Sequence, residues 1–114
     1  MSNDINKVLE ERGSRYGKFS THAEISVGMN DIFASGVKKR MYELGVLKEG
    51  IEYTDSEWTV IWNTYMPPIM QEAAKMITHK LARIANGDPH YDDSWRDIAG
   101  YATLVVNYIE GKEI

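Results

Sequence analysis

The sequence predicts an all-α protein, and three observations lead to that prediction. Apolar residues recur at the three- and four-residue spacing of an amphipathic helix along nearly the whole chain. Glycine or proline interrupts this spacing where one helix is expected to end and the next to begin. The 114 residues contain no internal repeat and are enough for one domain with its own core. We therefore expect a single helical domain over residues 1–114, built as a bundle of about five helices.

The first helix is expected over residues 3–12, where apolar side chains share one side of the helix and a glycine follows. Residues 13–19 then form a loop. Gly13 and Gly17 belong to this loop. We expect both to adopt positive φ angles, a backbone conformation that glycine reaches without steric cost.

The second helix is expected to begin at a capping box and to end at Gly45. In this motif the Thr21 side chain accepts a hydrogen bond from the Glu24 amide, and the Glu24 side chain reaches back to the amide of Thr21. The residues that follow, 45–53, are less regular. They are expected to form an irregular loop, with a short pair of strands as the alternative.

Two consecutive prolines separate the third helix from the fourth. The third begins at residue 55 or 56 and stops before Pro67. Proline lacks an amide hydrogen and has a fixed φ, so it ends one helix and suits the first turn of the next. The fourth helix is expected over residues 68–86, with Gly87 directly after its C-terminus.

A turn over residues 88–91 leads into the last helix, which Asp92 or Asp93 is expected to cap and which ends near residue 110. The last two helices are therefore expected to be antiparallel neighbours. Apolar side chains cover more than half the circumference of the last helix, which is more than one neighbouring helix can bury. This helix is either central in the monomer or partly buried between subunits, and we expect a homo-oligomer.

A lysine lies in the middle of the apolar face of the fourth helix. Projection at 100° per residue places Lys80 among apolar residues and Arg83 at the edge of that face. Because an unpaired buried charge is costly, such a lysine must either reach solvent or meet an acid. We expect Lys80 or Arg83 to pair with Asp97 of the last helix, either as a structural ion pair or as part of a ligand site.

Composition and charge argue against several classes of protein. With 43% hydrophobic and 26% charged residues, the chain is typical of globular proteins. The net charge of −4 and the lack of a basic stripe argue against non-specific nucleic-acid binding. The absence of cysteine excludes disulfides, a thiolate nucleophile and a cysteine-bound zinc site. No signal peptide or membrane span is recognisable, so we expect a cytoplasmic protein.

Most of the residues expected to contact a ligand lie around one loop. The candidates are Arg15, Tyr16, Lys18, Phe19, His22, Lys80, Arg83, Trp95 and Asp97. The loop precedes a helix N-terminus, where unpaired amides and the helix dipole favour an anion. The rings of Tyr16 and Phe19 can stack on a base, and His22 can donate to a phosphate. The alternative is that the rings only anchor the loop to the core and that His22 is packed there.

Three segments resemble a family of small, largely uncharacterised bacteriophage proteins. They are residues 11–19 (ERGSRYGKF), 76–84 (MITHKLARI) and 93–102 (DSWRDIAGYA), whereas residues 34–70 lie outside the resemblance. The family is similar in outline to phage nucleotide-modification-associated domains and, more distantly, to all-α nucleoside triphosphate pyrophosphohydrolases of the MazG type. The resemblance implies a small anionic, nucleotide-like ligand. This implication rests on analogy with the fold of these families and not on the chemistry of particular site residues.

The MazG-type enzymes hold magnesium with acidic residues on facing helices, as Glu-x-x-Glu on one and Glu-x-x-Asp on the next. For this chain the resemblance offers Glu72, Asp93 and Asp97 as metal ligands, with magnesium as the cofactor. The sequence departs from the pattern, since Lys75 stands where the second acid of the fourth helix would be. This departure disfavours hydrolysis.

Three functions therefore follow from the sequence. The first is a phage accessory protein that binds or sequesters a nucleotide or nucleotide-derived signal in the host cytoplasm, with a counter-defence role and no turnover. The second is a magnesium-dependent nucleotide pyrophosphohydrolase. The third is an interaction module for a host protein, which would use a surface formed by Trp58, Trp62 and Met66.

Overall fold

A computed structural model describes residues 2–112, apart from the side chains of residues 2, 3 and 13–15, and it confirms the all-α fold. Within these residues the helices are α1 (Ser2–Tyr16), α2 (Phe19–Glu43), α3 (Asp55–Tyr65), α4 (Pro68–Asn86) and α5 (Asp92–Ile109). No strand occurs in this part of the chain. The irregular residues 45–53 are therefore a loop, and the alternative of a strand pair is wrong.

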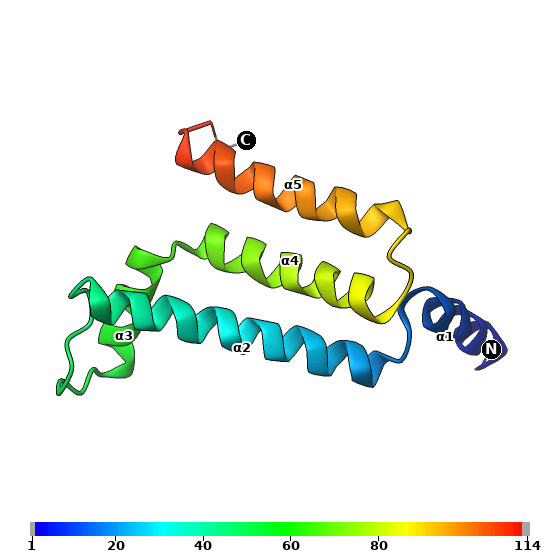
Figure 1. The fold of residues 1–114 in the computed structure, drawn as a ribbon, viewed down its shortest axis with the longest axis horizontal. Helices are drawn as coiled ribbons and strands as arrows, with labels where there is room; N and C mark the ends of the chain where they lie inside the picture. The colour runs from blue at the N-terminus through cyan, green and yellow to red at the C-terminus, as the bar shows by residue number, and fades with distance from the viewer. Residues whose placement is uncertain (1, 113–114) are drawn as a thin grey trace.

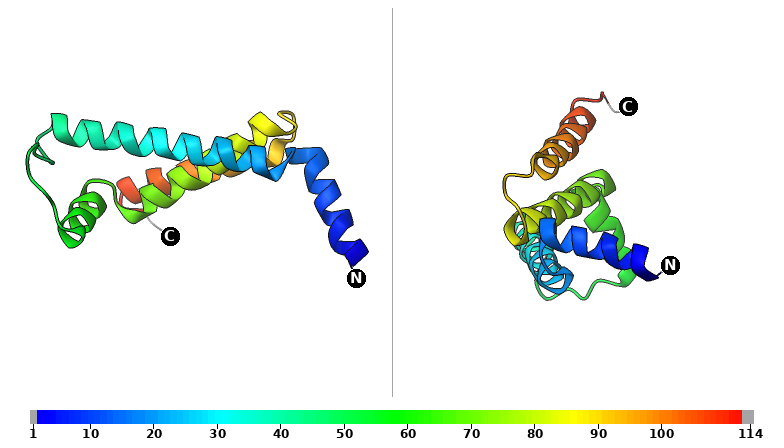
Figure 2. Two further views of the ribbon diagram at one scale, coloured as in Figure 1. Left: turned by 90° about the horizontal axis from the view of Figure 1, so that it is seen from below. Right: turned by 90° about the vertical axis from the view of Figure 1, so that its right-hand side faces the viewer.

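Helices α2, α4 and α5 form one layer with α4 in the middle (Figure 1). α4 packs against α2 on one side and against α5 on the other, and it runs antiparallel to both. α1 projects from one end of the layer, and α3 lies at the other end (Figure 2). The antiparallel pairing expected for the last two helices is therefore present.

The buried core is small, and much of it lies along α4. Ala73 and Ala82 of α4 are buried, and their small side chains allow neighbouring helices to approach. At the end of α2 the chain folds back at Gly45, whose φ is 75°, and this turn buries Leu47 beside Met41. The amides of residues 46 and 47 both donate to the Met41 carbonyl. The radius of gyration is 17.8 Å, compared with about 13 Å for a compact chain of this length.

Two expectations for the N-terminal helices are wrong. α1 continues through Gly13 to Tyr16, so the connection to α2 is only Gly17 and Lys18 rather than residues 13–19. A glycine inside a helix costs about 1 kcal/mol. This cost is offset because ring contacts hold Tyr16, the last residue of α1, against α4 and Tyr91. Gly17 has the expected positive φ of 74°.

The capping box expected at the start of α2 is also wrong. α2 begins at Phe19 with Lys18 as the N-cap residue, and no side chain caps this end. The helix starts earlier than expected because the chain turns at Gly17, and only Lys18, in an extended conformation, lies between this turn and Phe19. A capping box occurs instead at α3, where Thr54 Oγ1 accepts from the Glu57 amide at 3.1 Å and Glu57 Oε1 accepts from the Thr54 amide at 3.1 Å.

The boundaries of the later helices follow the sequence closely. Pro68 occupies the first turn of α4, and Gly87 is its C-cap residue. The expected aspartate cap of α5 is wrong, since Tyr91 is the N-cap residue and makes no side-chain cap bond. Asp92 and Asp93 lie in the first turn, where their charges interact favourably with the helix dipole. None of the helices described is long and apolar enough to cross a membrane.

The ion pair expected between the last two helices is present. Lys80 Nζ lies 2.8 Å from Asp97 Oδ2, and the lysine side chain is only 11% exposed. The Asp97 side chain is 39% exposed, so one partner of the pair still reaches solvent. The pair thus fixes the register of α5 on α4.

Removing the acid of this pair is expected to destabilise the fold. Asp97→Asn leaves the Lys80 ammonium nearly buried without its counter-charge, and the expected loss is about 2 kcal/mol of unfolding free energy, between the values for exposed and buried pairs. Urea unfolding measures this loss. The control is Glu43→Gln, which removes the acid of an exposed pair with Arg40 and should change stability by about 0.5 kcal/mol or less. If Asp97→Asn and Glu43→Gln lost the same unfolding free energy, the Lys80–Asp97 pair would stabilise the fold no more than an exposed ion pair does.

Candidate functional site

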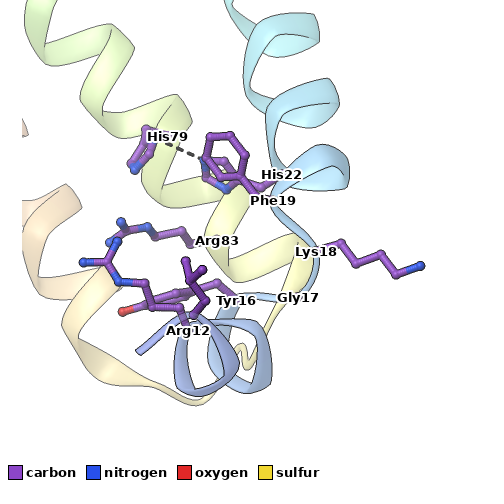
Figure 3. A pocket seen from close by; sticks show the side chains of 9 residues that line it. Arg12, Tyr16, Gly17, Lys18, Phe19, His22, His79 and Arg83 are labelled. Atoms are coloured by element: carbon purple, nitrogen blue, oxygen red, sulfur yellow. Dashed lines mark hydrogen bonds between the residues drawn. The ribbon is translucent and has the colours of Figure 1, made fainter. Parts of the chain in front are cut away.

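A pocket of about 530 Å³ opens where α1 meets α2 and α4 (Figure 3). Its lining combines cationic, aromatic and imidazole side chains and consists of Leu9, Arg12, Tyr16, Gly17, Lys18, Phe19, His22, His79 and Arg83. These residues come from the second half of α1, the junction with α2, the first turn of α2 and the second half of α4. The fold therefore brings together segments that are some sixty residues apart in the sequence.

Asn86, the last residue of α4, holds the junction of α1 and α2 in place. Its Nδ2 atom donates to the Tyr16 carbonyl at 2.7 Å and to the Lys18 carbonyl at 2.9 Å. Between these two carbonyls lies Gly17, with a φ of 74°, and a Cβ at this position would collide with the Asn86 carbonyl oxygen. Only glycine fits here, because both the backbone conformation and the close approach exclude a side chain.

An arginine on α4 is held against the aromatic ring that ends α1. The guanidinium carbon of Arg83 lies 4.5 Å from the centroid of the Tyr16 ring, a cation–π contact. The edge of the Tyr16 ring in turn meets Tyr91, at 6.3 Å between centroids. Arg12 extends its guanidinium group towards the same side of the pocket as Arg83 (Figure 3). Lys18, by contrast, points its side chain away from the other side chains (Figure 3).

Two histidines meet at the inner wall of the pocket. His22 Nε2 and His79 Nδ1 are 3.1 Å apart, so one imidazole donates to the other. His22 is buried, and the plane of Phe19 stacks over it at 6.0 Å between centroids. Nδ1 of His22 has no hydrogen-bond partner in the described part of the chain. Whichever nitrogen carries the proton, His22 therefore keeps one unsatisfied polar atom.

The surroundings of the histidine pair favour the neutral form of both imidazoles. Burial is the main cause that lowers the pKa of His22, and the positive charge of Arg83 lowers it further. Burial also lowers the pKa of His79, followed by the charges of Arg83, His22 and Lys80. An anion in the pocket would offset this repulsion and accept a hydrogen bond from an imidazolium.

The structure gathers five of the sequence-predicted ligand residues at this pocket: Tyr16, Lys18, Phe19, His22 and Arg83. The other candidates are placed elsewhere or lie outside the description. Lys80 and Asp97 are occupied with each other between α4 and α5. Trp95 is half-exposed on α5, and its Nε1 donates to the Pro89 carbonyl at 2.9 Å. The side chain of Arg15 lies outside the described residues.

Four lining residues were not among the sequence candidates for ligand contact: Leu9, Arg12, Gly17 and His79. Leu9 and Arg12 join the pocket because α1 extends to Tyr16 and turns this side towards α4. His79 precedes Arg83 by one helical turn. That spacing on one edge of α4 is the signal in the sequence that could have identified it.

The three acids considered as magnesium ligands do not meet. The Lys80–Asp97 pair fixes the alignment of α4 with α5. At 1.5 Å per residue, Glu72 lies about 12 Å from Lys80 along α4, and Asp93 lies about 6 Å from Asp97 in the opposite direction. Among the residues described, no three histidine, aspartate or glutamate side chains are grouped so that they could hold a metal. Glu72, Asp93 and Asp97 of one chain therefore do not form a shared metal site.

The tryptophans considered as an interaction surface are partly engaged within the chain. The rings of Trp58 and Trp62 stack at 5.5 Å between centroids, and the Lys38 ammonium lies 5.3 Å from the Trp58 ring. Both tryptophans are intermediate in exposure, as is Met66. These contacts connect α3 with α2.

The fold and the pocket define a class of small all-α protein with a pocket lined by cationic and aromatic side chains. The chain belongs to the DUF6378 family, described as a domain of unknown function, whose match covers residues 3–109. No curated protein and no solved structure matches the chain. The match includes every residue that lines the pocket.

Loss of the Asn86 side chain is expected to loosen the junction of α1 and α2. Asn86→Ala removes the donor that serves two carbonyls, so we expect a loss of about 1–3 kcal/mol in unfolding free energy. Urea unfolding followed by circular dichroism gives this value. Asn63→Ala is the matched control, since Asn63 accepts one exposed side-chain hydrogen bond and should lose about 0.5 kcal/mol or less. A loss no larger at Asn86 than at Asn63 would show that the junction does not depend on it.

The free energy of unfolding is expected to fall as the pH drops below 6.5. In the unfolded chain His22 and His79 regain the ordinary pKa of 6.5, whereas folding lowers both pKa values. The unfolded state then binds more protons than the folded state below that pH, and acidification destabilises the fold. Urea unfolding at several pH values should show a weaker dependence when His22→Gln and His79→Gln are combined. His90→Gln, at an exposed position, is the control and should keep the wild-type dependence of unfolding free energy on pH. The same pH dependence in wild type, the double variant and His90→Gln would show that His22 and His79 are not its source.

Proposed function

We propose that the protein binds a small anionic, nucleotide-like ligand in the pocket between α1, α2 and α4, and that it holds this ligand without turnover. The observation that carries the proposal is the convergence of the Arg12 and Arg83 guanidinium groups with the rings of Tyr16 and Phe19. Guanidinium groups bind phosphates in a bidentate manner, and aromatic rings stack on bases.

The charges at the pocket are suited to an anion. Within residues 2–112 no ion pair with a carboxylate is found for Arg12 or Arg83. The Tyr16 ring, 4.5 Å from the Arg83 guanidinium carbon, attracts this cation without neutralising its charge. A phosphate can bind there even though the net charge of the chain is −4.

The shape of the pocket suits a ligand with a flat apolar part. Its volume of about 530 Å³ falls within the range of small-molecule sites, roughly 300–1,000 Å³. Phe19 lies at the rim of the pocket and is 80% exposed. A base stacked on Phe19 would cover this ring.

The resemblance to phage proteins supports a biological setting for this binding. Two of the three similar segments, residues 11–19 and 76–84, supply all of the pocket residues except Leu9 and His22. We therefore extend the proposal to a phage accessory protein that sequesters a nucleotide-derived signal in the host cytoplasm, with a counter-defence role. The distant similarity to MazG-type enzymes supports the nucleotide character of the ligand but not its hydrolysis, because Glu72, Asp93 and Asp97 do not converge.

The experiment that tests the function is a panel of nucleotides that includes cyclic dinucleotides and ADP-ribose derivatives, each with and without magnesium. Thermal shift measures binding, and chromatography of the mixture measures turnover. We expect stabilisation by at least one compound, which is recovered intact. Magnesium-dependent cleavage would favour the hydrolase instead. If no compound shifts the melting temperature, a protein partner is favoured instead. Co-purification of a stoichiometric host protein through the Trp58 and Trp62 surface would then support that function.

Replacing Arg83 is expected to abolish most of the affinity for the compound found in this panel. Arg83→Gln removes a charged donor, which is worth about 1.5–3 kcal/mol or roughly a 10- to 150-fold rise in Kd. Isothermal titration calorimetry gives Kd directly. Arg40→Gln is the matched control, since Arg40 lies on α2 in an exposed pair with Glu43 and should leave Kd unchanged. Equal Kd values for wild type and Arg83→Gln would place the ligand elsewhere.

A further inference from the structure

We propose that the outer face of α5 joins two copies of this chain in an antiparallel, two-fold arrangement. The proposal concerns a different surface from the pocket and does not depend on the identity of the ligand.

The outer face of α5 carries a regular apolar stripe, which we call the α5 seam. It consists of Trp95, Ala99, Ala102, Val106 and Ile109, and all five are exposed. Successive members are separated by four, three, four and three residues. This alternation is the spacing by which one helix packs along another in a coiled coil.

The α5 seam is distinct from the face of α5 that packs on α4. The side of α5 that meets α4 carries the buried Ser94 and the less exposed Asp97, Ile98, Tyr101 and Val105. At 100° per residue, the centre of the α5 seam is about 100° away from the centre of that side. α5 also lies at the edge of the layer, with α4 as its neighbour (Figure 1, Figure 2). The chain therefore buries one apolar face of α5 and leaves the second without a helix against it.

The exposed area of the chain is larger than a stable monomer of this mass requires. A compact monomer of 13.0 kDa exposes about 6,300 Å², whereas this chain exposes 8320 Å². The excess is about 2,000 Å². Obligate homodimers cover about 1,000–2,500 Å² on each subunit. The excess is thus comparable with what one such interface removes, although α1 and α3 also contribute to it by projecting from the layer.

The pattern of side-chain sizes along the α5 seam is self-complementary when two copies run antiparallel. A two-fold axis at Ala102 places Ala102 against Ala102 of the second copy and the small Ala99 opposite Val106, so the helices can approach closely near the axis. The large Trp95 of each copy then lies opposite Ile109 of the other. A second copy of this chain fits such a pattern, because a two-fold interface uses the same surface patch on both subunits.

The charges that flank the α5 seam favour the same direction. Asp92 and Arg96 lie at its N-terminal end, and Glu110 and Lys112 lie at its C-terminal end. Antiparallel pairing brings Asp92 towards Lys112 and Arg96 towards Glu110 of the second copy. Within one chain Asp92 pairs with Arg96 at 2.9 Å and Glu110 pairs with Lys112 at 3.1 Å, so antiparallel pairing would join these two pairs into a network of alternating charges.

Mass in solution tests the interface on the whole chain. Sedimentation or light scattering of the wild type at tens of micromolar should give twice the chain mass of 13.0 kDa. Ala102→Glu places two carboxylates together at the axis and should raise the dimer Kd by about 100-fold or more. Gly100→Glu is the matched control, since it adds the same charge on the other side of α5, where a Cβ meets open space. A monomeric wild type, or dissociation by Gly100→Glu as complete as by Ala102→Glu, would overturn the proposal.

Cross-linking tests the direction of the pairing, including the case in which Ala102→Glu fails to fold. The chain has no cysteine, so Ala102→Cys introduces a single thiol near the two-fold axis. Mild oxidation should convert this variant into a disulfide-linked dimer. Ile109→Cys should not link to itself, but it should link to Trp95→Cys when the two variants are mixed. Self-linking of Ile109→Cys, or failure of Ala102→Cys to link, would overturn the antiparallel arrangement.

Discussion

The packing of α4 between α2 and α5 is the constraint on which the other features of the molecule depend. Small buried residues such as Ala73 and Ala82 let α4 lie close to its neighbours. One edge of α4 presents His79 and Arg83 to the pocket, and the adjoining face presents Lys80 to α5. The last residue, Asn86, holds the junction of α1 and α2. α4 therefore positions one wall of the pocket and sets the register of α5. Its last residue, Asn86, also holds the turn between α1 and α2.

The basic residues of α4 have different partners, and this difference gives the pocket its charge. Lys80 meets the carboxylate of Asp97, so its charge is balanced within the protein. Arg83 instead lies over the ring of Tyr16, which attracts a cation without neutralising it. The Arg83 charge therefore still acts on its surroundings: burial is the main cause that lowers the pKa of His22 and of His79, and the Arg83 charge is the second. An acidic chain can in this way keep a locally positive cavity, which neutral imidazoles line without adding further repulsion.

The sequence predicted those features that depend on periodicity over a whole helix. The bounds of α4 and the partnership of Lys80 with Asp97 follow from the apolar spacing, because a charge in the middle of an apolar face requires an acid nearby. Features decided by contacts distant in the sequence could not be predicted. Helix α1 passes through Gly13 because Tyr16 packs against Arg83, and this longer helix brings Arg12 into the pocket. Local propensity carries no information about such contacts.

The pocket and the α5 seam lie on different parts of the layer, and this separation has a mechanical consequence. No residue of α5 lines the pocket, whose walls come from α1, α2 and α4. A second copy seated along Trp95, Ala102 and Ile109 would therefore leave the pocket open to solvent. Each copy would carry its own complete cavity, since neither cavity needs a side chain from the other chain. Ligand affinity and self-association can then be measured separately. A variant that loses ligand binding but still self-associates is folded, and the same holds for a variant that loses self-association but still binds the ligand.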